Sequence, residues 1–320
     1  MQKILITGAT GFIGSHLIEQ LRLFPQYEVI GTSDRKNILS QKDRGILICN
    51  LTNAKKVTNL LENTRPDLII HLAAVLPQKI EFEFHSYRVN VLGTYNLLEA
   101  AQRVGTKKIF FASSINVYGK PQYYPIDEKH PRRPVGVYGF TKLLGESICQ
   151  MFESGSDMKF VIMRFPGIYG MGRNTGIVFE LAKKALRHQT IVAPSDGTDT
   201  FSVLHIEDAV RAIIQAVRFL SEGKGGIFNI GGNTVQGSNL AERIISYTQS
   251  KSHVRYERKV AAVHLSLDSQ KASERLDFEP NNLGANLQSF ISHLKTESPP
   301  LDKNQEGGWS IRRILAILAR

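Results

Sequence analysis

The chain has 320 residues, of which 42% are hydrophobic and 22% are charged, a balance typical of a globular protein with a sizeable core. Its formal net charge of +11 is compatible with an anionic partner, but the basic residues are scattered and follow no nucleic-acid-binding motif. We therefore expect phosphate-bearing small molecules as ligands, and no nucleic acid. Cys49 and Cys149 stand far apart without metal-ligand spacing, which predicts neither a disulfide framework nor a metal site.

Targeting signals are not evident in the sequence. No apolar run reaches the roughly 18 residues of a membrane span. A strand-like run over residues 4–7 leaves no room for a signal peptide before it. These observations predict a cytoplasmic location.

The first half of the sequence alternates short aliphatic runs with longer amphipathic segments, the pattern of βαβ units. Strands are predicted over residues 3–7, 28–32, 45–49, 68–72, 108–112 and 159–164. Helices are predicted over residues 13–24, 54–63, 89–104 and 138–152. Because crossovers between parallel strands are right-handed, these elements predict an α/β fold with a doubly wound parallel (Rossmann) sheet.

The regularity loosens after about Phe165, which predicts a smaller C-terminal substrate domain. We expect a dinucleotide-binding domain over residues 1–165, with a later return near 204–222, and a mainly substrate-binding part over 166–294. Residues 295–308 read as a linker, since Ser, Pro, Asn and Gly are frequent there. Residues 309–320 form an amphipathic tail pattern. Packing on this fold or on a second subunit, contact with a membrane surface, and disorder all stay open for the tail.

A glycine-rich turn follows the first predicted strand and opens the first predicted helix. Gly8, Gly11 and Gly14 are spaced three and three, with Phe12 and Ile13 between the last two. Glycines in this context let backbone amides approach a pyrophosphate at the helix N-terminus. The turn therefore predicts a dinucleotide site.

The end of the second predicted strand bears on the choice between NAD and NADP. An acidic residue there holds the ribose hydroxyls of NAD, and a basic residue accepts the 2′-phosphate of NADP. The acidic position is occupied by Ser33, with Asp34 one residue late and Arg35 and Lys36 after it. NAD or NADP is expected, with NADP slightly favoured.

Three further residues suggest hydride chemistry on a carbonyl or a secondary alcohol. Tyr138 and Lys142 lie four apart, on one face of a predicted helix. The Lys142 ammonium is predicted to lower the pKa of the Tyr138 phenol, because it favours the phenolate. Ser114 follows a strand at the carboxyl edge of the sheet, where it can hydrogen-bond a substrate oxygen. The triad predicts an enzyme.

These motifs resemble the extended short-chain dehydrogenases/reductases, in particular the NAD-dependent epimerase/dehydratase family that includes UDP-glucose 4-epimerase. The resemblance covers residues 1–294 and rests on the following stretches: 8–14, 71–74, 90–94, 113–119, 164–170, 204–208, 228–232, 268–272 and the Tyr138/Lys142 pair. It implies that Ser114, Tyr138 and Lys142 are catalytic and that the following residues contact the cofactor: Gly8, Gly11, Phe12, Ile13, Gly14, Ser33, Asp34, Arg35, Asn50, Leu51, Leu72, Ala73, Ala74, Asn90, Tyr138 and Lys142. Asn50 stands where the family often has an adenine-contacting Asp. A homodimer through the helices that contain residues 89 and 138 is a further implication.

Departures from the family pattern narrow the reaction. Ile115 and Asn116 stand where sugar 4,6-dehydratases carry an acid pair, so dehydration is disfavoured. Asn116 also replaces the Cys of GDP-sugar epimerase/reductases. Gly167 and Phe201 replace an Asn and an Arg that contact nucleotide sugars in the family. A substitute cation could come from Arg173, Arg187 or Lys183, but the sequence does not place any of them.

Three functions stay open at this stage. The first is a nucleotide-sugar epimerase that works through a keto intermediate and retains its cofactor. The second is a net reductase or dehydrogenase of a sugar or other carbonyl compound, which exchanges its cofactor at every turnover. The third is a non-enzymatic module that senses a dinucleotide through the same fold.

Overall fold

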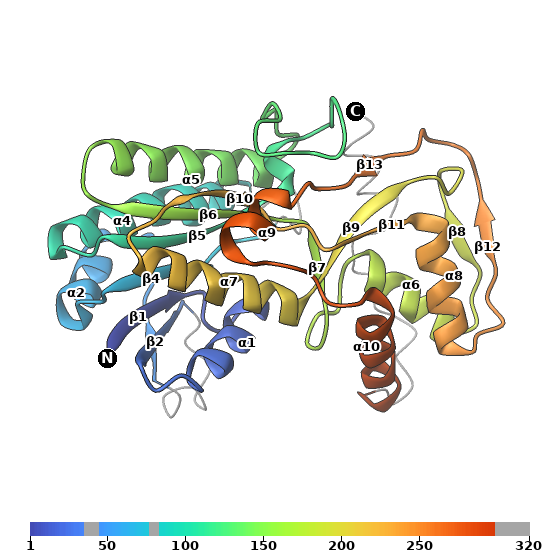
Figure 1. Ribbon diagram of the computed structural model, residues 1–320, viewed down its shortest axis with the longest axis horizontal. Coiled ribbons are helices and arrows are strands. Elements are labelled where there is room, and N and C mark those ends of the chain that lie inside the picture. The colour runs from blue at the N-terminus through green and yellow to red at the C-terminus, as the bar shows by residue number, and fades with distance from the viewer. Residues whose placement is uncertain (35–44, 77–82, 298–320) are drawn as a thin grey trace.

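A seven-stranded parallel sheet forms the centre of the protein, as a computed structural model that describes residues 1–34, 45–76 and 83–297 shows (Figure 1). The strands follow the order β10-β6-β5-β4-β1-β2-β3. Their bounds are β1 Gln2–Thr7, β2 Tyr27–Ser33, β3 Ile46–Ile48, β4 Leu68–His71, β5 Lys108–Ser114, β6 Lys159–Phe165 and β10 Gly226–Asn229. The strand order reverses between β1 and β4, and in doubly wound sheets ligands bind at this point of reversal. The predicted Rossmann sheet is confirmed.

Helices cover both faces of this sheet, as Figure 1 shows. On one face α1 and α7 pack against β1, β4, β5 and β6, and on the other face α2, α4 and α5 pack against the same strands. The bounds of these helices are α1 Phe12–Leu21, α2 Ala54–Thr64, α4 Gly93–Val104, α5 Val137–Ser154 and α7 Ile206–Ser221. Because both faces are buried, the strands read as continuous aliphatic runs in the sequence.

The helix predicted over residues 89–104 is not one regular helix. A short helix α3, Glu83–Tyr87, leads into a π-helical turn over Arg88–Leu92, and only then does α4 begin. The widened turn places Asn90 inward, where it is 3% exposed. Gly105 caps the C-terminus of α4, with a left-handed φ of +83° that favours glycine.

The remaining elements form smaller sheets beside the large one, at the right of Figure 1. One small sheet contains β7 Gly167–Tyr169, β9 Thr200–His205, β11 Asn233–Gln236 and β13 His264–Leu265, and β8 Ile191–Ala193 pairs with β12 Val254–Tyr256. Helices α6 Ile177–Leu186, α8 Gly237–Thr248 and α10 Leu283–Glu297 share a core of their own with these strands. The short helix α9, Gln270–Leu276, packs against α7.

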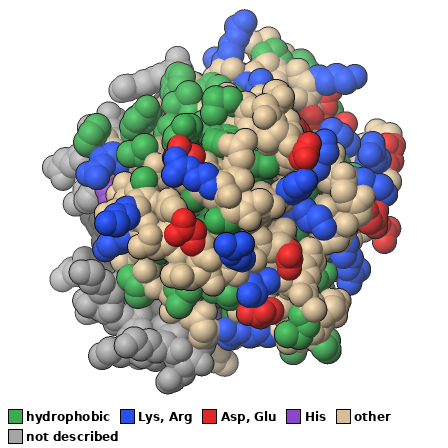
Figure 2. Space-filling model, turned by 90° about the vertical axis from the view of Figure 1, so that its left-hand side faces the viewer, with side chains coloured by type: hydrophobic (Ala, Val, Ile, Leu, Met, Phe, Trp, Pro, Cys, Tyr) green, Lys and Arg blue, Asp and Glu red, His purple; other side chains and the backbone are tan. Residues whose placement is uncertain are grey.

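The end of the chain departs from the predicted linker at one point. α10 continues to Glu297, so the first residues of the linker predicted over 295–308 are helical. The rest of that linker and the amphipathic tail lie outside the described residues. Within the described part, no helix is long and apolar enough to cross a membrane. Figure 2 shows Lys and Arg side chains interspersed with Asp and Glu over one end of the molecule.

Candidate active site

The glycine turn lies at the carboxyl end of β1 and is closely packed. Gly8 has a left-handed φ of +69°, and a Cβ on it would lie 2.7 Å from the backbone nitrogen of Ala73. A Cβ on Gly14 would lie 2.3 Å from the carbonyl oxygen of Gly8. Only glycine fits at either position, because even one methyl group would collide with backbone atoms.

The same turn leaves the N-terminus of α1 uncapped. Gly11 is the N-cap residue, no side chain accepts a hydrogen bond there, and the first turn contains no acidic residue. The amides of Phe12, Ile13 and Gly14 therefore lack an intrahelical acceptor, and the positive end of the helix dipole is uncompensated. This cradle fits the pyrophosphate of a dinucleotide.

The residues predicted to contact the adenosine lie at and just after the ends of β2 and β3. Ser33 is buried and its Oγ lies 2.9 Å from Thr10 Oγ1, whereas Asp34 is exposed. Arg35 and Lys36 lie outside the described residues. Asn50 is exposed and accepts hydrogen bonds from the Thr52 backbone and hydroxyl, both at 2.9 Å. Leu51, which follows it, is buried at 6% exposure.

Asn90 fastens the segment after β4 to α5. Its Oδ1 accepts from the Val75 nitrogen at 2.7 Å, and its Nδ2 donates to the Val75 carbonyl at 3.1 Å and to Thr141 Oγ1 at 3.0 Å. Leu72, Ala73 and Ala74, which precede Val75, are half-buried. Because its amide is already hydrogen-bonded within the protein, Asn90 positions these residues and the start of α5 together.

His71 ends β4 and lies between two threonines. Its Nδ1 is 2.6 Å from Thr7 Oγ1 and its Nε2 is 2.9 Å from Thr94 Oγ1. Burial lowers the pKa of His71 to about 3, and the Lys142 charge contributes in the same direction. A neutral, enclosed imidazole of this kind holds strands and helices together and is unsuited to general acid–base work at neutral pH.

Ser114 and Tyr138 meet at the carboxyl edge of the sheet. β5 ends at Ser114, which is 8% exposed, and α5 presents a half-buried Tyr138 that is close enough to the Ser114 hydroxyl for this group to favour its phenolate and so act to lower the pKa of Tyr138. Two glycines allow this approach. A Cβ on Gly139 would lie 2.4 Å from the Asn116 carbonyl oxygen, and one on Gly145 would lie 2.5 Å from the Phe111 ring.

The position of Lys142 contradicts one prediction made from the sequence. Its ammonium donates to the Ala112 carbonyl oxygen at 2.7 Å and lies 5.9 Å from the centroid of the Tyr138 ring. Burial raises the pKa of Tyr138 to about 12, and the groups that oppose this rise are Arg173 and Ser114. Burial also lowers the pKa of Lys142 to about 8. The prediction that Lys142 lowers the pKa of Tyr138 is therefore wrong for this structure, because desolvation outweighs the charge and the ammonium points to the strand.

A buried network that the sequence analysis missed surrounds these residues. Glu146, one turn after Lys142, accepts from Ser113 Oγ at 2.5 Å and binds Arg164 through two hydrogen bonds of 2.9 and 2.7 Å. Arg164 also donates to the Tyr118 hydroxyl at 2.7 Å. The i, i+4 spacing of Lys142 and Glu146 is visible in the sequence. The contact between Glu146 and Arg164 of β6 is not, because it depends on how α5 packs against the sheet. The network fixes β5, β6 and α5 relative to one another.

Of the three cations considered as substitutes, Arg173 alone is placed by its contacts beside the proposed site. Its guanidinium carbon lies 5.4 Å from the centroid of the Phe12 ring, and its charge lowers the pKa of Tyr138. Lys183 instead lies over the Phe179 ring at 6.0 Å, and Arg187 caps the end of α6. Phe201 is buried in β9.

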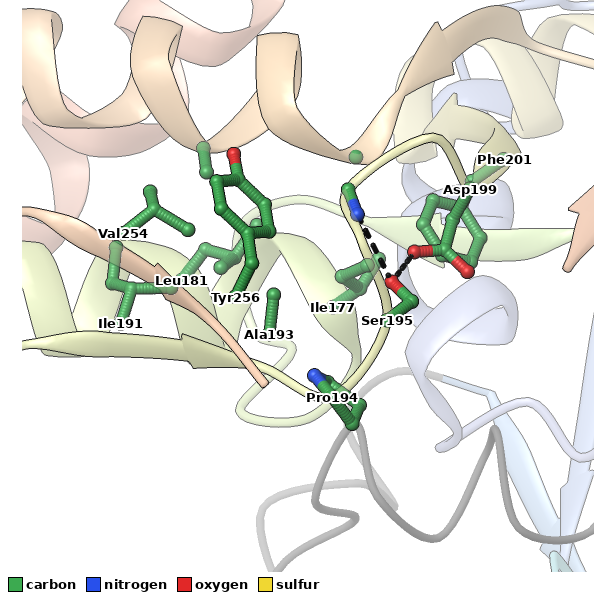
Figure 3. A pocket seen from close by; sticks show the side chains of 13 residues that line it. Ile177, Leu181, Ile191, Ala193, Pro194, Ser195, Asp199, Phe201, Val254 and Tyr256 are labelled. Atoms are coloured by element: carbon green, nitrogen blue, oxygen red, sulfur yellow. Dashed lines mark hydrogen bonds between the residues drawn. The ribbon is translucent and has the colours of Figure 1, made fainter. Parts of the chain in front are cut away.

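A small cavity lies among α6, α8, β8 and β12, and Figure 3 shows the side chains of Leu181, Val254 and Tyr256 facing it. Its volume is about 30 Å³, which is room for only one or two water molecules. It is lined by Ile177, Leu181, Ile191, Ala193, Pro194, Ser195, Gly197, Asp199, Phe201, Gly237, Ala241, Val254 and Tyr256. Because it is small and mainly apolar, it is a packing gap, and the chemistry belongs to the sheet edge described above.

Metal chemistry has no candidate centre in the described ranges, where no cluster of three or more His, Cys, Asp or Glu residues could hold an ion. Cys49 and Cys149 are buried free thiols. Burial raises the pKa of both thiols, which makes them poor nucleophiles.

The doubly wound sheet, the uncapped glycine turn and the Ser114/Tyr138/Lys142 group together define a short-chain dehydrogenase/reductase. The chain belongs to the NAD dependent epimerase/dehydratase family, whose family model matches residues 4–231. The resemblance noted from the sequence is therefore confirmed.

Relatives of known name extend over almost the whole chain. An uncharacterised UDP-glucose epimerase from Bacillus subtilis is 30% identical over 92% of this chain and 98% of its own length. A putative UDP-glucose 4-epimerase from Methanocaldococcus jannaschii is 28% identical over 92% of this chain and 99% of its own length.

Solved structures agree with the fold. The UDP-glucuronic acid 4-epimerase of Bacillus cereus, in complex with UDP-glucuronic acid and NAD, superposes with a TM-score of 0.80 at 26% identity, over 92% of this chain and 99% of that one. The UDP-glucose 4-epimerase of Thermotoga maritima reaches a TM-score of 0.81 at 24% identity, over 92% and 99% of the two chains.

Proposed function

We propose that this protein is an NAD(P)-dependent epimerase that inverts a hydroxyl-bearing carbon of a nucleotide sugar through a keto intermediate. The observation that carries the proposal is the approach of Tyr138 to Ser114 at the carboxyl edge of β5, beside Lys142 and in the sheet whose first strand leads into the uncapped glycine turn. Family membership and the relatives named as UDP-glucose epimerases support the same reaction.

Each residue of the triad has a separate task in this proposal. In its phenolate form, which the Arg173 charge and the Ser114 hydroxyl favour by acting to lower the pKa of Tyr138, Tyr138 accepts the proton of the sugar hydroxyl as the carbon is oxidised to a ketone, and returns the proton when the ketone is reduced from the other face. Ser114 donates a hydrogen bond to the same substrate oxygen. Lys142 adds positive charge to the site and holds the end of β5 through Ala112. When bound, the cofactor supplies a nicotinamide that accepts and returns the hydride.

The anion cradle at the glycine turn indicates which residues would contact the cofactor. Gly8, Gly11 and Gly14, with the amides of Phe12 and Ile13, would hold the pyrophosphate. Ser33, Asp34, Asn50 and Leu51 would line the adenosine end, and Leu72 to Ala74 the adjoining wall. The family is NAD dependent. A preference for NADP stays a prediction, since it rests on Ser33, Arg35 and Lys36, and a comparison of NAD and NADP affinities tests it.

The first experiment asks whether purified protein retains a dinucleotide. The protein is denatured, and the released cofactor is quantified by absorbance and mass spectrometry. Near-stoichiometric NAD supports the epimerase cycle and leads to a panel of UDP-, GDP- and dTDP-sugars. An empty site that binds NADPH reversibly favours the alternative, a net reductase of a sugar or another carbonyl compound.

Substitution of the triad separates an enzyme from a module that only senses dinucleotide. Tyr138→Phe removes the proton acceptor, and a loss of about 100- to 10,000-fold in turnover is expected, in line with general acid–base catalysis. Dinucleotide binding is expected to persist in this variant. The exposed Tyr124→Phe change is the matched control and should leave turnover unchanged. Wild-type protein that binds dinucleotide but turns over no sugar supports the sensing module.

We also propose that the protein forms a homodimer through α3, α4 and α5. These helices expose large apolar side chains at Phe84, Tyr87, Tyr95, Phe140 and Leu144, which are 39–74% exposed. Such side chains are typical of a surface that becomes buried on association. Sedimentation is expected to show a dimer that dissociates in a Phe140→Asp/Leu144→Asp variant, and not in a Leu23→Asp control. A monomeric wild-type protein contradicts this proposal.

A further inference from the structure

The turn after β7 brings a cation from the second half of the chain onto the glycine turn. The backbone N–H of Arg173 donates to the Gly170 carbonyl oxygen at 3.2 Å, and Gly172 adopts a φ of +83°. A Cβ on Gly172 would approach His16 and Phe12 at 3.9 and 4.0 Å, so this turn lies directly over the beginning of α1. The Arg173 guanidinium then packs over the Phe12 ring at 5.4 Å.

Arg173 has no anionic partner among the described residues. Its Nε is buried and makes no hydrogen bond, and none of the ion pairs in the described ranges involves its guanidinium. The Phe12 ring offers a cation–π contact but no acceptor for the N–H groups. Arg173 as a whole is half-buried, but enclosing its Nε without an acceptor is unfavourable, so an arginine in this environment indicates a binding partner outside the chain.

Arg164 is an arginine of this protein whose role is structural, and it can be compared with Arg173. That side chain is 1% exposed, and Glu146, Tyr118 and the Glu128 carbonyl accept its hydrogen bonds. Arg173 has no comparable set of acceptors. The difference indicates that the role of Arg173 lies in binding rather than in holding the fold together.

The surroundings of Arg173 indicate the chemistry of the missing partner. On one side Phe12 belongs to the helix turn whose amides form the anion cradle. On the other side the guanidinium is close enough to Tyr138 to favour its phenolate. An anionic group held between the glycine turn and Tyr138 would contact both the cradle and the cation. Phosphate oxygens match a guanidinium well because they accept its paired N–H groups.

We propose that Arg173 binds a phosphate oxygen of the ligands that occupy this site, with Phe12 holding the guanidinium in position by stacking. The inference rests on the proposed function, because the phosphate comes either from the pyrophosphate of the dinucleotide or from the diphosphate of the nucleotide sugar. Arg173 is thus assigned as an affinity-determining residue that joins the second half of the chain to the dinucleotide site.

Calorimetric titration of the full chain with NAD and, separately, with UDP tests the assignment without any turnover. Arg173→Ala is expected to weaken one of the two affinities by about 10- to 100-fold, the range of a charge-assisted hydrogen bond. Arg173→Lys should recover part of the loss, since it restores the charge without the planar fork. A loss for NAD alone identifies the cofactor pyrophosphate as the source, and a loss for UDP alone identifies the substrate.

Two further measurements separate binding from a structural role. Arg218 lies over the Phe24 ring at 5.9 Å, so Arg218→Ala removes a similar stacked arginine elsewhere and should leave both affinities unchanged. The free energy of unfolding of the unliganded Arg173→Ala protein should equal or exceed that of the wild type, because an unpaired charge is removed. Affinities within about 2-fold of wild type, well below one charge-assisted bond, or a marked loss of stability, overturn the assignment. Wild-type protein that binds neither ligand contradicts the proposed function itself.

Discussion

Arg164 and Glu146 form a doubly hydrogen-bonded ion pair in which both side chains are almost completely buried, at 1% and 0% exposure. The Glu146→Gln change keeps the size of the side chain but leaves the Arg164 charge without its counter-charge. We expect the free energy of unfolding to fall by about 3–5 kcal/mol, the usual cost of breaking a buried pair. Chemical denaturation measures it.

The control for this prediction is an ion pair of similar geometry on the surface. Glu99 and Arg103 lie 2.8 Å apart on α4, with 34% and 61% of the side chains exposed. Glu99→Gln should change the free energy of unfolding by less than about 1 kcal/mol. Equal effects of the two substitutions would show that the buried pair is not important for stability.

Gly8→Ala is expected to be far more harmful than the same change at Gly105. Both glycines have left-handed φ angles, of +69° and +83°, so both variants carry a similar backbone cost of about 1–2 kcal/mol. Only at Gly8 would the new methyl group also meet backbone atoms of Ala73, whereas nothing lies within 4 Å at Gly105. Thermal denaturation and NAD titration of both variants measure the difference. Equal stabilities would contradict the close packing of the turn against Ala73.

His71 is expected to make the fold sensitive to acid. Its pKa is about 3 in the folded protein, against an ordinary value of 6.5. As the pH falls from 6.5 toward 3, the unfolded chain therefore binds a proton that the folded chain does not, and stability decreases. The contribution approaches about 1.4 kcal/mol per pH unit within this window.

Urea denaturation at several pH values between neutrality and pH 4 isolates this contribution by comparing slopes. His71→Leu should be less stable at neutral pH, because Thr7 and Thr94 lose a partner, but its stability should depend less steeply on pH. His253→Gln, at an exposed position, should keep the wild-type slope. A wild-type slope in the His71→Leu protein would argue against a neutral buried imidazole.

Gly139→Ala should separate Tyr138 from Ser114 without unfolding the protein. The added methyl group would lie 2.4 Å from the Asn116 carbonyl oxygen and 2.9 Å from Pro134, so α5 must shift away from the end of β5. A misplacement of about 1 Å in a reacting group lowers turnover on the order of 100-fold. Turnover of the nucleotide sugar identified by the panel measures the effect. Gly155→Ala, at the other end of α5 and at a negative φ, is the control and should leave turnover unchanged.

The sequence predicted the large sheet well because its strands are aliphatic runs buried on both faces, which are conspicuous against amphipathic helices. It missed β10, since Gly226–Asn229 follows a glycine-rich turn and becomes a strand only by pairing with β6. The π-helical turn at Arg88–Leu92 was also missed, because hydrophobic periodicity does not distinguish one widened turn.

The sequence predicted which residues form the candidate site, but it did not predict the pKa shifts of these residues. The end of a predicted strand indicated Ser114, and the i, i+4 spacing on a predicted helix indicated Tyr138 and Lys142. The direction of the Tyr138 pKa shift depends on burial and on where the Lys142 ammonium points, and neither is visible in a sequence. Arg173 reaches the glycine turn through a turn that follows a different sheet, so only the folded chain shows it to be near Phe12.

The chain of hydrogen bonds through His71 has a fixed direction. Thr94 donates to the Asn90 carbonyl oxygen at 2.7 Å, so its oxygen is left to accept from His71 Nε2. The imidazole is neutral, and its Nδ1 must therefore accept a hydrogen bond from the Thr7 hydroxyl. Thr7 Oγ1 in turn accepts the backbone N–H of Ala73. A single backbone carbonyl thus selects the Nε2–H tautomer of His71, and this line cannot conduct protons between the sheet and the cofactor cradle.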